Sequence, residues 1–300
     1  MPQILVATRD GLRTFDDHGV EGAVHHRGRD VTAVARDGSH LWAIVGGAEL
    51  LSTTGGEEWS QVAGLEGLAA TCLAMTDVMC VGSSQARLFR LIGEQLEAVT
   101  GFDGANGRES WYTPWGGPPD TRSMSEWDAD VYVNVHVGGI LRSDDRGETW
   151  TPTIDIDADV HQVATAEGLV LAACAGGLAT STDRGATWTF RTEGLEAPYS
   201  RAVVVCGDQV LVSASNGPSG GRSGVYRGDL AGGGFERCRA GLPDWFDENI
   251  DTYCLDAPPD GSLATIATSD GHLYGSSDIG STWNELASGL PPVRHVLVVP

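Results

Sequence analysis

One eight-residue stretch, SDDRGETW at residues 143–150, shows how this chain is built. It recurs as STDRGATW at residues 181–188 and as SSDIGSTW at residues 276–283. A worn copy, STTGGEEW, occupies residues 52–59. The shared pattern is Ser-x-Asp-x-Gly-x-Thr-Trp, and three good matches in 300 residues exceed chance. The chain is therefore made of repeats, and their spacing is the first guide to its fold.

The spacing between the copies gives the size of one structural unit. Ser143 and Ser181 are 38 residues apart, whereas Ser52 to Ser143 is 91 residues and Ser181 to Ser276 is 95, each two units of about 45. Between the copies, short runs rich in Val, Leu and Ala alternate with Gly, Asp and Pro turns, and helical periodicity is nearly absent. Four-stranded units of this length predict the blades of a β-propeller.

We predict an all-β fold, a seven-bladed β-propeller with four-stranded blades, that spans residues 1–300 as a single domain. The innermost strands are expected to start near residues 31, 70, 121, 160, 200 and 252. Residues 3–29 hold about three strands and residues 293–299 form one more, so the two ends predict a seventh blade. The C-terminal strand would then join the N-terminal blade and remove open sheet edges.

The repeat itself is expected to be structural. It falls in the hairpin between the third and fourth strands of a blade, where Ser and Asp side chains bond the turn backbone and Gly accepts a positive φ. The aspartates are predicted to be turn caps (Asp145, Asp183 and Asp278), and the tryptophans are predicted to pack between blades (Trp59, Trp150, Trp188 and Trp283).

Composition narrows the classes of partner. The chain has 41 acidic residues, 19 basic residues that are all Arg, and a net charge of −22. Such a field repels phosphate, so we expect no nucleic-acid partner and no membrane partner. We expect no secretory signal. No apolar spanning run and no CxxC pair occurs, and the six cysteines are expected to be reduced core residues of a cytoplasmic protein.

The repeat resembles the BNR or Asp-box repeats of sialidases, sortilin-type receptors and photosystem-assembly propellers. Resemblance to sialidases implies a glycosidase with an arginine triad, a Tyr–Glu nucleophile pair and an Asp acid. The Arg-Ile-Pro motif that usually precedes the first sialidase box is absent from this chain. Resemblance to the photosystem-assembly propellers implies a scaffold for protein partners without chemistry of its own.

Alignment of the predicted inner strands places a polar residue at the second position of each strand, where it would line one mouth of the channel. These residues are Thr32, Thr71, Arg122, His161, Arg201, Tyr253 and Arg294. Three arginines crowd together only when something negative lies among them. That partner is either a set of neighbouring Asp and Glu side chains or a bound carboxylate, and the sequence leaves both open.

Two long loops, residues 104–120 and 241–251, enter the same mouth and carry aromatic and polar side chains. They form either a wall over a small ligand or a plug for the channel. The ligand-contacting candidates in them are Trp111, Tyr112, Trp115, Trp245 and Asn249. A third loop, residues 216–224, is expected to cover the same face.

Three histidines, His136, His161 and His295, are expected near this mouth. Each is either a polar strand residue, a general base or a metal ligand. No HxH or HxxxH spacing supports a metal. We therefore predict no cofactor, with a divalent metal held by these three histidines as the alternative.

The leading hypothesis is a small anionic ligand, a carboxylate-bearing sugar or metabolite, held by Arg122, Arg201 and Arg294 beside His136 and His295. A glycosidase-like hydrolase is the catalytic form of this hypothesis. In that form Tyr253 with Glu248 or Asp247 would supply nucleophile and base, and His161 or His136 would move protons. The alternatives are a metal-assisted lyase or hydrolase and a scaffold that binds a protein partner.

Overall fold

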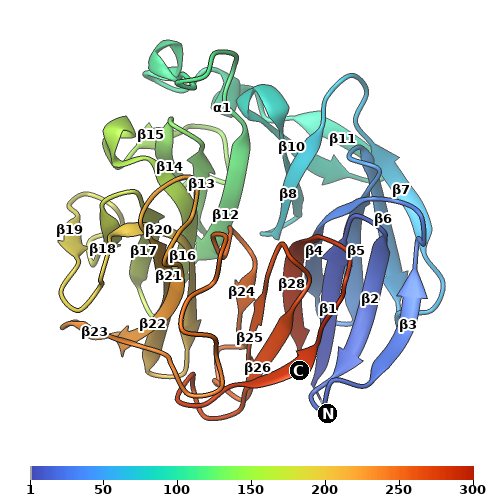
Figure 1. Ribbon diagram of the computed structural model, residues 1–300. Helices are drawn as coiled ribbons and strands as arrows, with labels where there is room; N and C mark the ends of the chain where they lie inside the picture. Colours follow the sequence, from blue (N-terminus) through green and yellow to red (C-terminus); the bar gives the residue numbers. More distant parts are fainter. Residues whose placement is uncertain (1) are drawn as a thin grey trace. The chain divides into compact units, whose positions relative to one another are not determined.

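The computed structural model describes residues 2–300, and almost all of its regular structure is β-strand. Over this range the strands form seven four-stranded antiparallel sheets (Figure 1). This is the topology of a seven-bladed β-propeller, and the prediction of the fold class is confirmed.

The closing blade joins both ends of the chain in one sheet, in the order β28-β1-β2-β3. In Figure 1 the red strand β28 lies beside the blue strand β1. Their bounds are β28 (Val293–Val299), β1 (Gln3–Thr8), β2 (Gly11–Asp16) and β3 (Glu21–His25). Ile4 and Val6 of β1 share a buried cluster with Val296 and Val298 of β28, so apolar packing supports the backbone pairing.

Contacts divide the chain into two compact units, which are described separately here. The terminal unit comprises residues 1–30, 172–179 and 189–300. Beside the closing blade it contains two complete sheets. Their strands are β20 (Tyr199–Cys206), β21 (Gln209–Ser215), β22 (Gly224–Asp229), β23 (Phe235–Arg237), β24 (Leu255–Asp256), β25 (Ala264–Ala267), β26 (Leu273–Ser276) and β27 (Asn284–Ala287).

The second unit, called here the 31–171 unit, comprises residues 31–171 and 180–188. It contains three complete sheets and the short helices of three connections. Their bounds are β4 (Val31–Asp37), β5 (His40–Val45), β6 (Glu49–Thr54), β7 (Ser60–Gly64), β8 (Ala70–Met75), β9 (Met79–Ser83), η1 (Ser84–Ala86), β10 (Arg87–Ile92), β11 (Gln95–Ala98), α1 (Thr100–Asp103), η2 (Arg108–Ser110), β12 (Thr121–Trp127), β13 (Asp130–Val135), β14 (Gly139–Ser143), β15 (Thr151–Pro152) and η3 (Ile156–Ala158).

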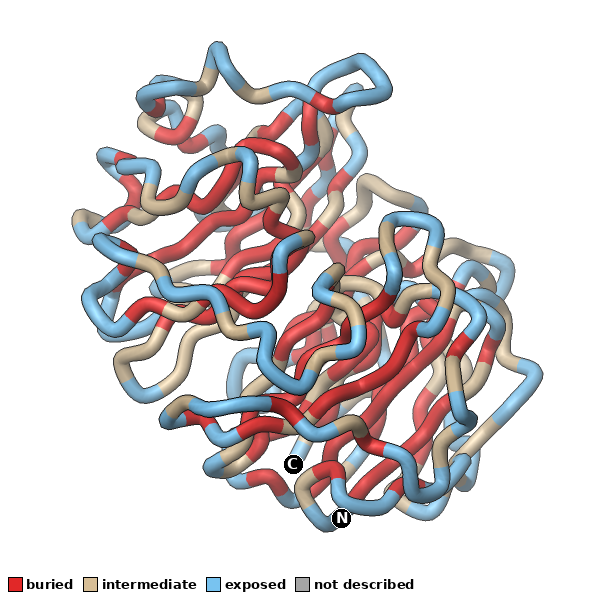
Figure 2. Tube along the Cα trace, turned by 60° about the vertical axis from the view of Figure 1, so that its left-hand side comes forward, coloured by how far each residue is buried: buried red, intermediate tan, exposed pale blue. Residues whose placement is uncertain are grey.

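The remaining sheet has the order β16-β17-β18-β19, and the boundary between the units passes through β17 and β18. The bounds of its strands are β16 (Val160–Ala166), β17 (Leu169–Cys174), β18 (Gly177–Ser181) and β19 (Thr189–Arg191). The buried residues concentrate in the three inner strands of the sheets, whereas outer strands such as β11 and β15 are largely exposed, as are most loops (Figure 2). All six cysteines are buried and free, as the sequence predicts.

The eight-residue repeat forms the hairpin between the third and fourth strands, as predicted. The Ser143 hydroxyl accepts a hydrogen bond from the Gly147 N–H at 2.7 Å. The Asp145 carboxylate accepts from the Thr149 N–H at 2.9 Å and from the Thr149 hydroxyl at 2.6 Å, and these bonds lower the pKa of Asp145 to about 2. The same bonds recur in the copies at residues 181–188 and 276–283.

Two details of the repeat differ from the prediction. The residue before each glycine is also left-handed, with φ of 59° at Arg146 and 57° at Ile279, so each turn needs two such residues in succession. Trp150 and Trp283 are buried as core anchors, whereas Trp59 and Trp188 remain partly exposed. The prediction of a buried anchor therefore holds for only two of the four copies.

The inner strands share an irregularity that the sequence did not reveal. The pairing register jumps over the second residue of β4, β8, β12 and β28, and over the third and fourth residues of β20. The residues passed over are Thr32, Thr71, Arg122, Arg201 with Ala202, and Arg294. Such bulges release a side chain from the alternating pattern and redirect it. The predicted polar column thus coincides with five bulges.

The start of one inner strand was predicted wrongly. Strand β24 begins at Leu255, three residues after the predicted start near residue 252. Tyr253 lies in the preceding turn with a positive φ of 63°. A non-glycine residue in this region carries backbone strain, which the surrounding contacts must maintain.

No helix among residues 2–300 is long and apolar enough to cross a membrane.

Candidate functional site

The terminal unit contains a cavity of about 300 Å³ between the ends of β20 and β28 and the loop before β24. Its lining includes three arginines, Arg9, Arg201 and Arg294. Glu248, Asn249 and Asp251 also line it. Arg201, Arg294, Glu248 and Asn249 were candidates from the sequence, whereas Arg9 and Asp251 were missed.

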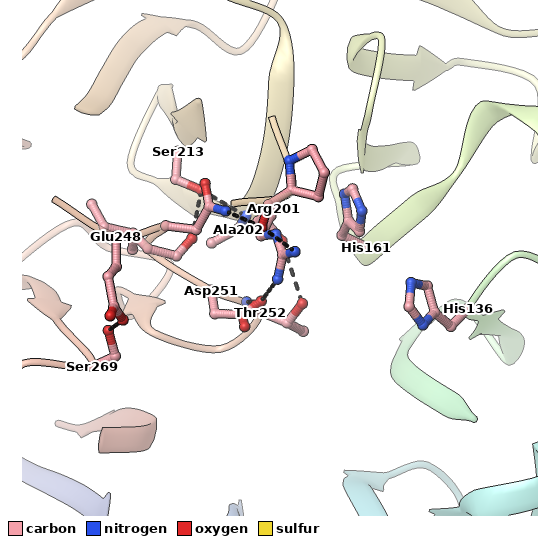
Figure 3. A network of polar contacts seen from close by, with 12 residues as sticks. His136, His161, Arg201, Ala202, Ser213, Glu248, Asp251, Thr252 and Ser269 are labelled. Atoms are coloured by element: carbon pink, nitrogen blue, oxygen red, sulfur yellow. Dashed lines mark hydrogen bonds and ion pairs between the residues drawn. The ribbon is translucent and has the colours of Figure 1, made fainter. Parts of the chain in front are cut away.

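Arg201 is the most enclosed of the three arginines, with 17% of its side chain exposed. Its Nη1 donates to Asp251 at 3.0 Å, and its Nη2 donates to the Pro218 carbonyl at 3.4 Å (Figure 3). The guanidinium also lies 5.5 Å from the Tyr199 ring centroid. Burial acts to lower the pKa of Arg201, but Asp251 and Tyr199 outweigh it and the net shift is upward. The Nε atom is buried and has no hydrogen-bond partner among the described residues.

The backbone around Arg201 is held by Ser213. The Ser213 hydroxyl accepts from the Ala202 N–H at 2.9 Å and donates to the Ile250 carbonyl at 2.9 Å (Figure 3). One buried hydroxyl therefore ties the bulge of β20 to the loop that carries Glu248, Asn249 and Asp251. This arrangement fixes the arginine and its acidic partner relative to each other.

The other two arginines differ in how they are paired. Arg294 on β28 contacts the Asp30 carboxylate through Nε at 3.4 Å and Nη2 at 3.2 Å. Arg9, in the turn between β1 and β2, is exposed and forms no ion pair with any residue in the range 2–300. The cavity therefore has one guanidinium that remains available to a ligand.

The loop that carries Glu248 and Asn249 is braced against its neighbours. The Asn249 amide donates to the Gly217 and Pro218 carbonyls at 3.1 and 3.2 Å, which holds the loop of residues 216–224 over the cavity. Ser269 donates a hydrogen bond to the Glu248 carboxylate (Figure 3). Asp247 is exposed and is not part of the cavity lining.

Three further candidates from the sequence, Tyr253, His295 and Trp245, lie outside the cavity lining. The Tyr253 ring stacks on the His295 ring, with centroids 4.6 Å apart and planes 2° apart, and burial lowers the pKa of His295 to about 3. Trp245 lies between Arg222 and Arg237, whose guanidinium carbons are 4.8 and 3.7 Å from its ring centroid. Their surroundings suit a structural role, because these aromatic faces are already covered.

The 31–171 unit holds the remaining candidates. The imidazole groups of His136 and His161 lie 6.2 Å apart, and both face the Asp159 carboxylate (Figure 3 shows the two histidines). A hydrogen bond from His161 lowers the pKa of Asp159, and the positive charge of Arg122 acts in the same direction. The donor group that converges here therefore contains Asp159 and does not contain His295, contrary to the predicted set of three histidines.

The aromatic residues of the loop at 104–120 divide into two kinds. Trp111 packs on Phe102 of α1 at 5.9 Å and is covered by the Arg108 guanidinium at 4.8 Å, which makes it an anchor of the loop. Trp115 is 69% exposed and lies 5.1 Å from the His136 ring, and Tyr112 is 48% exposed. Trp115 therefore provides the aromatic wall beside the histidines, whereas Trp111 does not.

Comparison with known proteins identifies the fold and leaves the family open. No protein-family model matches the chain, and no curated protein matches its sequence, so the resemblance to Asp-box families rests on the repeats alone. Among solved structures, YCF48 from Cyanidioschyzon merolae is 14% identical with a TM-score of 0.60, over 97% of this chain and 90% of YCF48. A second YCF48 structure, bound to a D1 peptide, is 14% identical with a TM-score of 0.58, over 94% and 84% of the two chains.

Larger proteins share the same fold. A GH74 xyloglucanase from Xanthomonas campestris is 18% identical with a TM-score of 0.68, over 95% of this chain and 52% of the enzyme. The extracellular domain of a two-component system from B. thetaiotaomicron is 10% identical with a TM-score of 0.63, and this chain spans 88% of its own length and 35% of that domain. At these identities the similarity establishes the propeller fold and says nothing of activity.

Proposed function

We propose that this protein binds a small carboxylate-bearing ligand, such as an acidic sugar or metabolite, in the cavity beside Arg201. The observation that carries the proposal is the set of unused donors there. The buried Arg201 Nε has no partner in the described part of the chain, and the Arg9 guanidinium pairs with no carboxylate in it. A planar guanidinium favours carboxylates because its N–H groups match both carboxylate oxygens.

The sequence left open whether neighbouring acids or a bound carboxylate balances the charge of the arginines, and the ion pairs in the cavity bear on both alternatives. Asp251 pairs with Arg201 and Asp30 pairs with Arg294, so neighbouring acids do neutralise part of the cluster. They also hold both guanidinium groups in fixed orientations, which lowers the entropy that a ligand must overcome. A volume of about 300 Å³ is at the small end of known ligand pockets and suits a monosaccharide or a metabolite of similar size.

The test compares one acidic sugar with its neutral counterpart. We expect galacturonate to raise the melting temperature of the purified chain and to bind in calorimetry, while galactose at the same concentration does neither. Arg9→Ala is the sharpest variant, because this exposed side chain has no ion pair to lose on substitution. Loss of a charged hydrogen bond of about 1.5–3 kcal/mol predicts roughly a 10- to 100-fold weaker Kd.

The matched control is Arg27→Ala, which removes an equally exposed arginine of the terminal unit away from the cavity lining. It carries the same charge change and is expected to bind galacturonate as the unmodified chain does. Equal affinity of the two variants for galacturonate would show that Arg9 contributes no more to binding than an arginine outside the cavity, and would contradict its assigned role. If neither galacturonate nor N-acetylneuraminate, citrate and succinate bind, the proposal of a carboxylate ligand is wrong.

A glycosidase-like activity at this cavity is the catalytic form of the proposal. It needs two carboxyl groups beside the scissile bond, and the cavity lining provides Glu248 and Asp251. Glu248→Gln is then expected to abolish release of nitrophenol from 4-nitrophenyl glucuronide while galacturonate binding persists. Unchanged turnover in this variant would remove Glu248 from the catalytic role.

A peptide carboxyl terminus is a second source of the same chemistry, and YCF48 in complex with a D1 peptide favours testing it. A pool of short peptides with free carboxyl termini is compared with the same pool in amidated form. Binding of the free pool alone, lost in Arg9→Ala, would assign the cavity to a protein partner. Binding of galacturonate without either pool would assign it to a metabolite.

A further inference from the structure

A separate set of donor atoms gathers in the 31–171 unit, outside the cavity described above. His136 directly follows β13, Asp159 directly precedes β16, and His161 is the second residue of β16. One ligand atom from each of the three side chains lies within 4.8 Å of the other two. Two imidazole nitrogens and a carboxylate oxygen form a donor set that zinc and related divalent transition ions prefer.

The distances are close to those of a metal site. His161 Nε2 lies 3.5 Å from Asp159 Oδ2, and His136 Nε2 lies 3.9 Å from Asp159 Oδ1. Metal–ligand bonds of about 2.0–2.2 Å in tetrahedral geometry place neighbouring donors about 3.4 Å apart. The two His–Asp distances exceed this value by at most about 0.5 Å, and the 4.8 Å that bounds the whole group exceeds it by about 1.4 Å, so side-chain shifts of up to about 1 Å would bring the donors onto one ion.

The chain holds Asp159 in an unusual conformation that presents its carboxylate to both histidines. Asp155 caps the preceding 3-10 turn by accepting from the Asp157 N–H at 2.9 Å, and Asp159 ends that turn with φ of 49°. The Asp159 Oδ1 atom is buried and has no hydrogen-bond partner among residues 2–300. A buried carboxylate oxygen without a donor is costly unless a cation compensates it.

The histidines are also positioned by neighbouring groups. The His161 side chain is fully buried, and the Asn134 amide donates to the carbonyl of the preceding Val160 at 3.1 Å. The exposed Trp115 ring lies 5.1 Å from the His136 ring and covers one side of the group. Ligands held on a strand or directly at a strand end are better preorganised than ligands on free loops.

We propose that His136, Asp159 and His161 form a binding site for one divalent transition ion, with Zn²⁺ as the best fit to the donors. Three protein ligands leave at least one coordination position open, as in catalytic rather than structural zinc sites. Trp115 and Arg122 border this group, so a molecule at the open position would meet an aromatic ring and a positive charge. The proposal is independent of the carboxylate cavity in the terminal unit.

The experiment uses the full chain after treatment with EDTA and dialysis. Titration with ZnCl₂ in a calorimeter is expected to show one tight site per chain, and CoCl₂ is expected to give the visible absorption bands of a four- or five-coordinate ion. Asp159→Asn is the central variant, because Asn tolerates the same left-handed backbone and keeps the shape of the side chain. Loss of a direct ligand should weaken Zn²⁺ binding by more than the 10- to 100-fold typical of outer-sphere changes.

His136→Gln is the second ligand variant, since 19% of this side chain is exposed and its replacement disturbs the core less than that of His161. The matched control is His40→Gln, an exposed histidine of the same unit that lies outside the donor group. Circular dichroism of each EDTA-treated variant establishes that it is folded before titration. Tight binding retained only by the unmodified chain and His40→Gln supports the site.

Two results would overturn the proposal. One is equal Zn²⁺ affinity in Asp159→Asn and in the unmodified chain, which would place the ion elsewhere on the acidic surface. The other is weak binding at several sites with no visible Co²⁺ bands in any folded form, which would leave the three residues as an internal His–Asp–His hydrogen-bonded group.

Discussion

The strand that closes the propeller is held partly by one half-buried acid, and this makes a testable prediction about pH. Asp256 of β24 accepts a hydrogen bond from the Val298 N–H of β28 at 2.7 Å. Burial raises the pKa of Asp256 to about 6, although bonds from the Val298 and Ala257 N–H groups partly oppose the shift. The folded chain therefore binds a proton at this carboxyl more tightly than the unfolded chain does.

The sign and size of the effect follow from the two pKa values. A carboxyl with a raised pKa adds stability below the unfolded value near 3.9, and this contribution is lost as pH rises through the folded value near 6. A shift of about two units corresponds to about 3 kcal/mol over the whole window. About half of it falls between pH 5 and pH 8, where ordinary carboxyl groups no longer titrate.

The perturbation is Asp256→Asn, which keeps an acceptor for Val298 and removes the charge. The free energy of unfolding is measured with urea at pH 5, 6, 7 and 8 for this variant and for the unmodified chain. We expect the variant to gain about 1.4 kcal/mol relative to the unmodified chain between pH 5 and pH 8. Cys206 nearby stays neutral in this window, because burial raises its pKa to about 11.

The control is Asp260→Asn in the following turn, where hydrogen bonds from Ser262 lower the pKa of the acid. A lowered pKa adds stability that is fully present above the unfolded value near 3.9 and is lost only on acidification below it, so the difference between Asp260→Asn and the unmodified chain should stay constant from pH 5 to pH 8. A stability difference between Asp256→Asn and the unmodified chain that stays constant from pH 5 to pH 8 would refute the reasoning. That result would mean that solvent reaches the Asp256 carboxylate.

Two further substitutions, each with a matched control, test the backbone of one hairpin and of one loop between blades. Ser276→Ala removes the hydroxyl that accepts from the buried Gly280 N–H at 2.9 Å, so we expect the free energy of unfolding to fall by about 1–3 kcal/mol. The control is Ser52→Ala in the worn copy of the repeat, which should change the free energy of unfolding by less than about 0.5 kcal/mol. Gly241 has a positive φ, and Gly241→Ala would place a methyl group 1.7 Å from a backbone oxygen. The control is Gly47→Ala, whose added carbon meets open space. Urea titration should show a far larger loss in the free energy of unfolding for Gly241→Ala than for Gly47→Ala. Equal losses within either pair would contradict the assigned contacts.

Much of the fold follows from the sequence because its signals are local. Ser143, Asp145, Gly147 and Thr149 bond one another within a span of seven residues, so their pattern specifies the hairpin without help from the rest of the chain. Regular spacing of these hairpins then predicts four-stranded units and their number. The terminal strands could be assigned for the same reason, since only one strand was missing from the N-terminal blade.

The errors occur where local signals are weak. The residues around Tyr253 predict the start of a strand. In the structure the chain makes a left-handed turn there, because the Tyr253 carbonyl accepts a hydrogen bond from the Val296 N–H at 2.9 Å. That bond comes from a strand more than forty residues later in the chain. The bulges at Arg122 and Arg294 have no pattern in a single sequence either, because they depend on the register of the partner strand.

The sequence by itself determined the blades, the hairpins that repeat along them and the polar residues at the starts of the inner strands, because these depend on neighbours within one turn or one strand. Only the tertiary structure decided which of those residues meet. It brought Arg9 to the cavity of Arg201 and Arg294, and it joined Asp159 to His136 and His161. The physical reason is that residues far apart in the chain share a site only after long-range strand pairing. That pairing cannot be predicted from the spacing of the residues in the sequence.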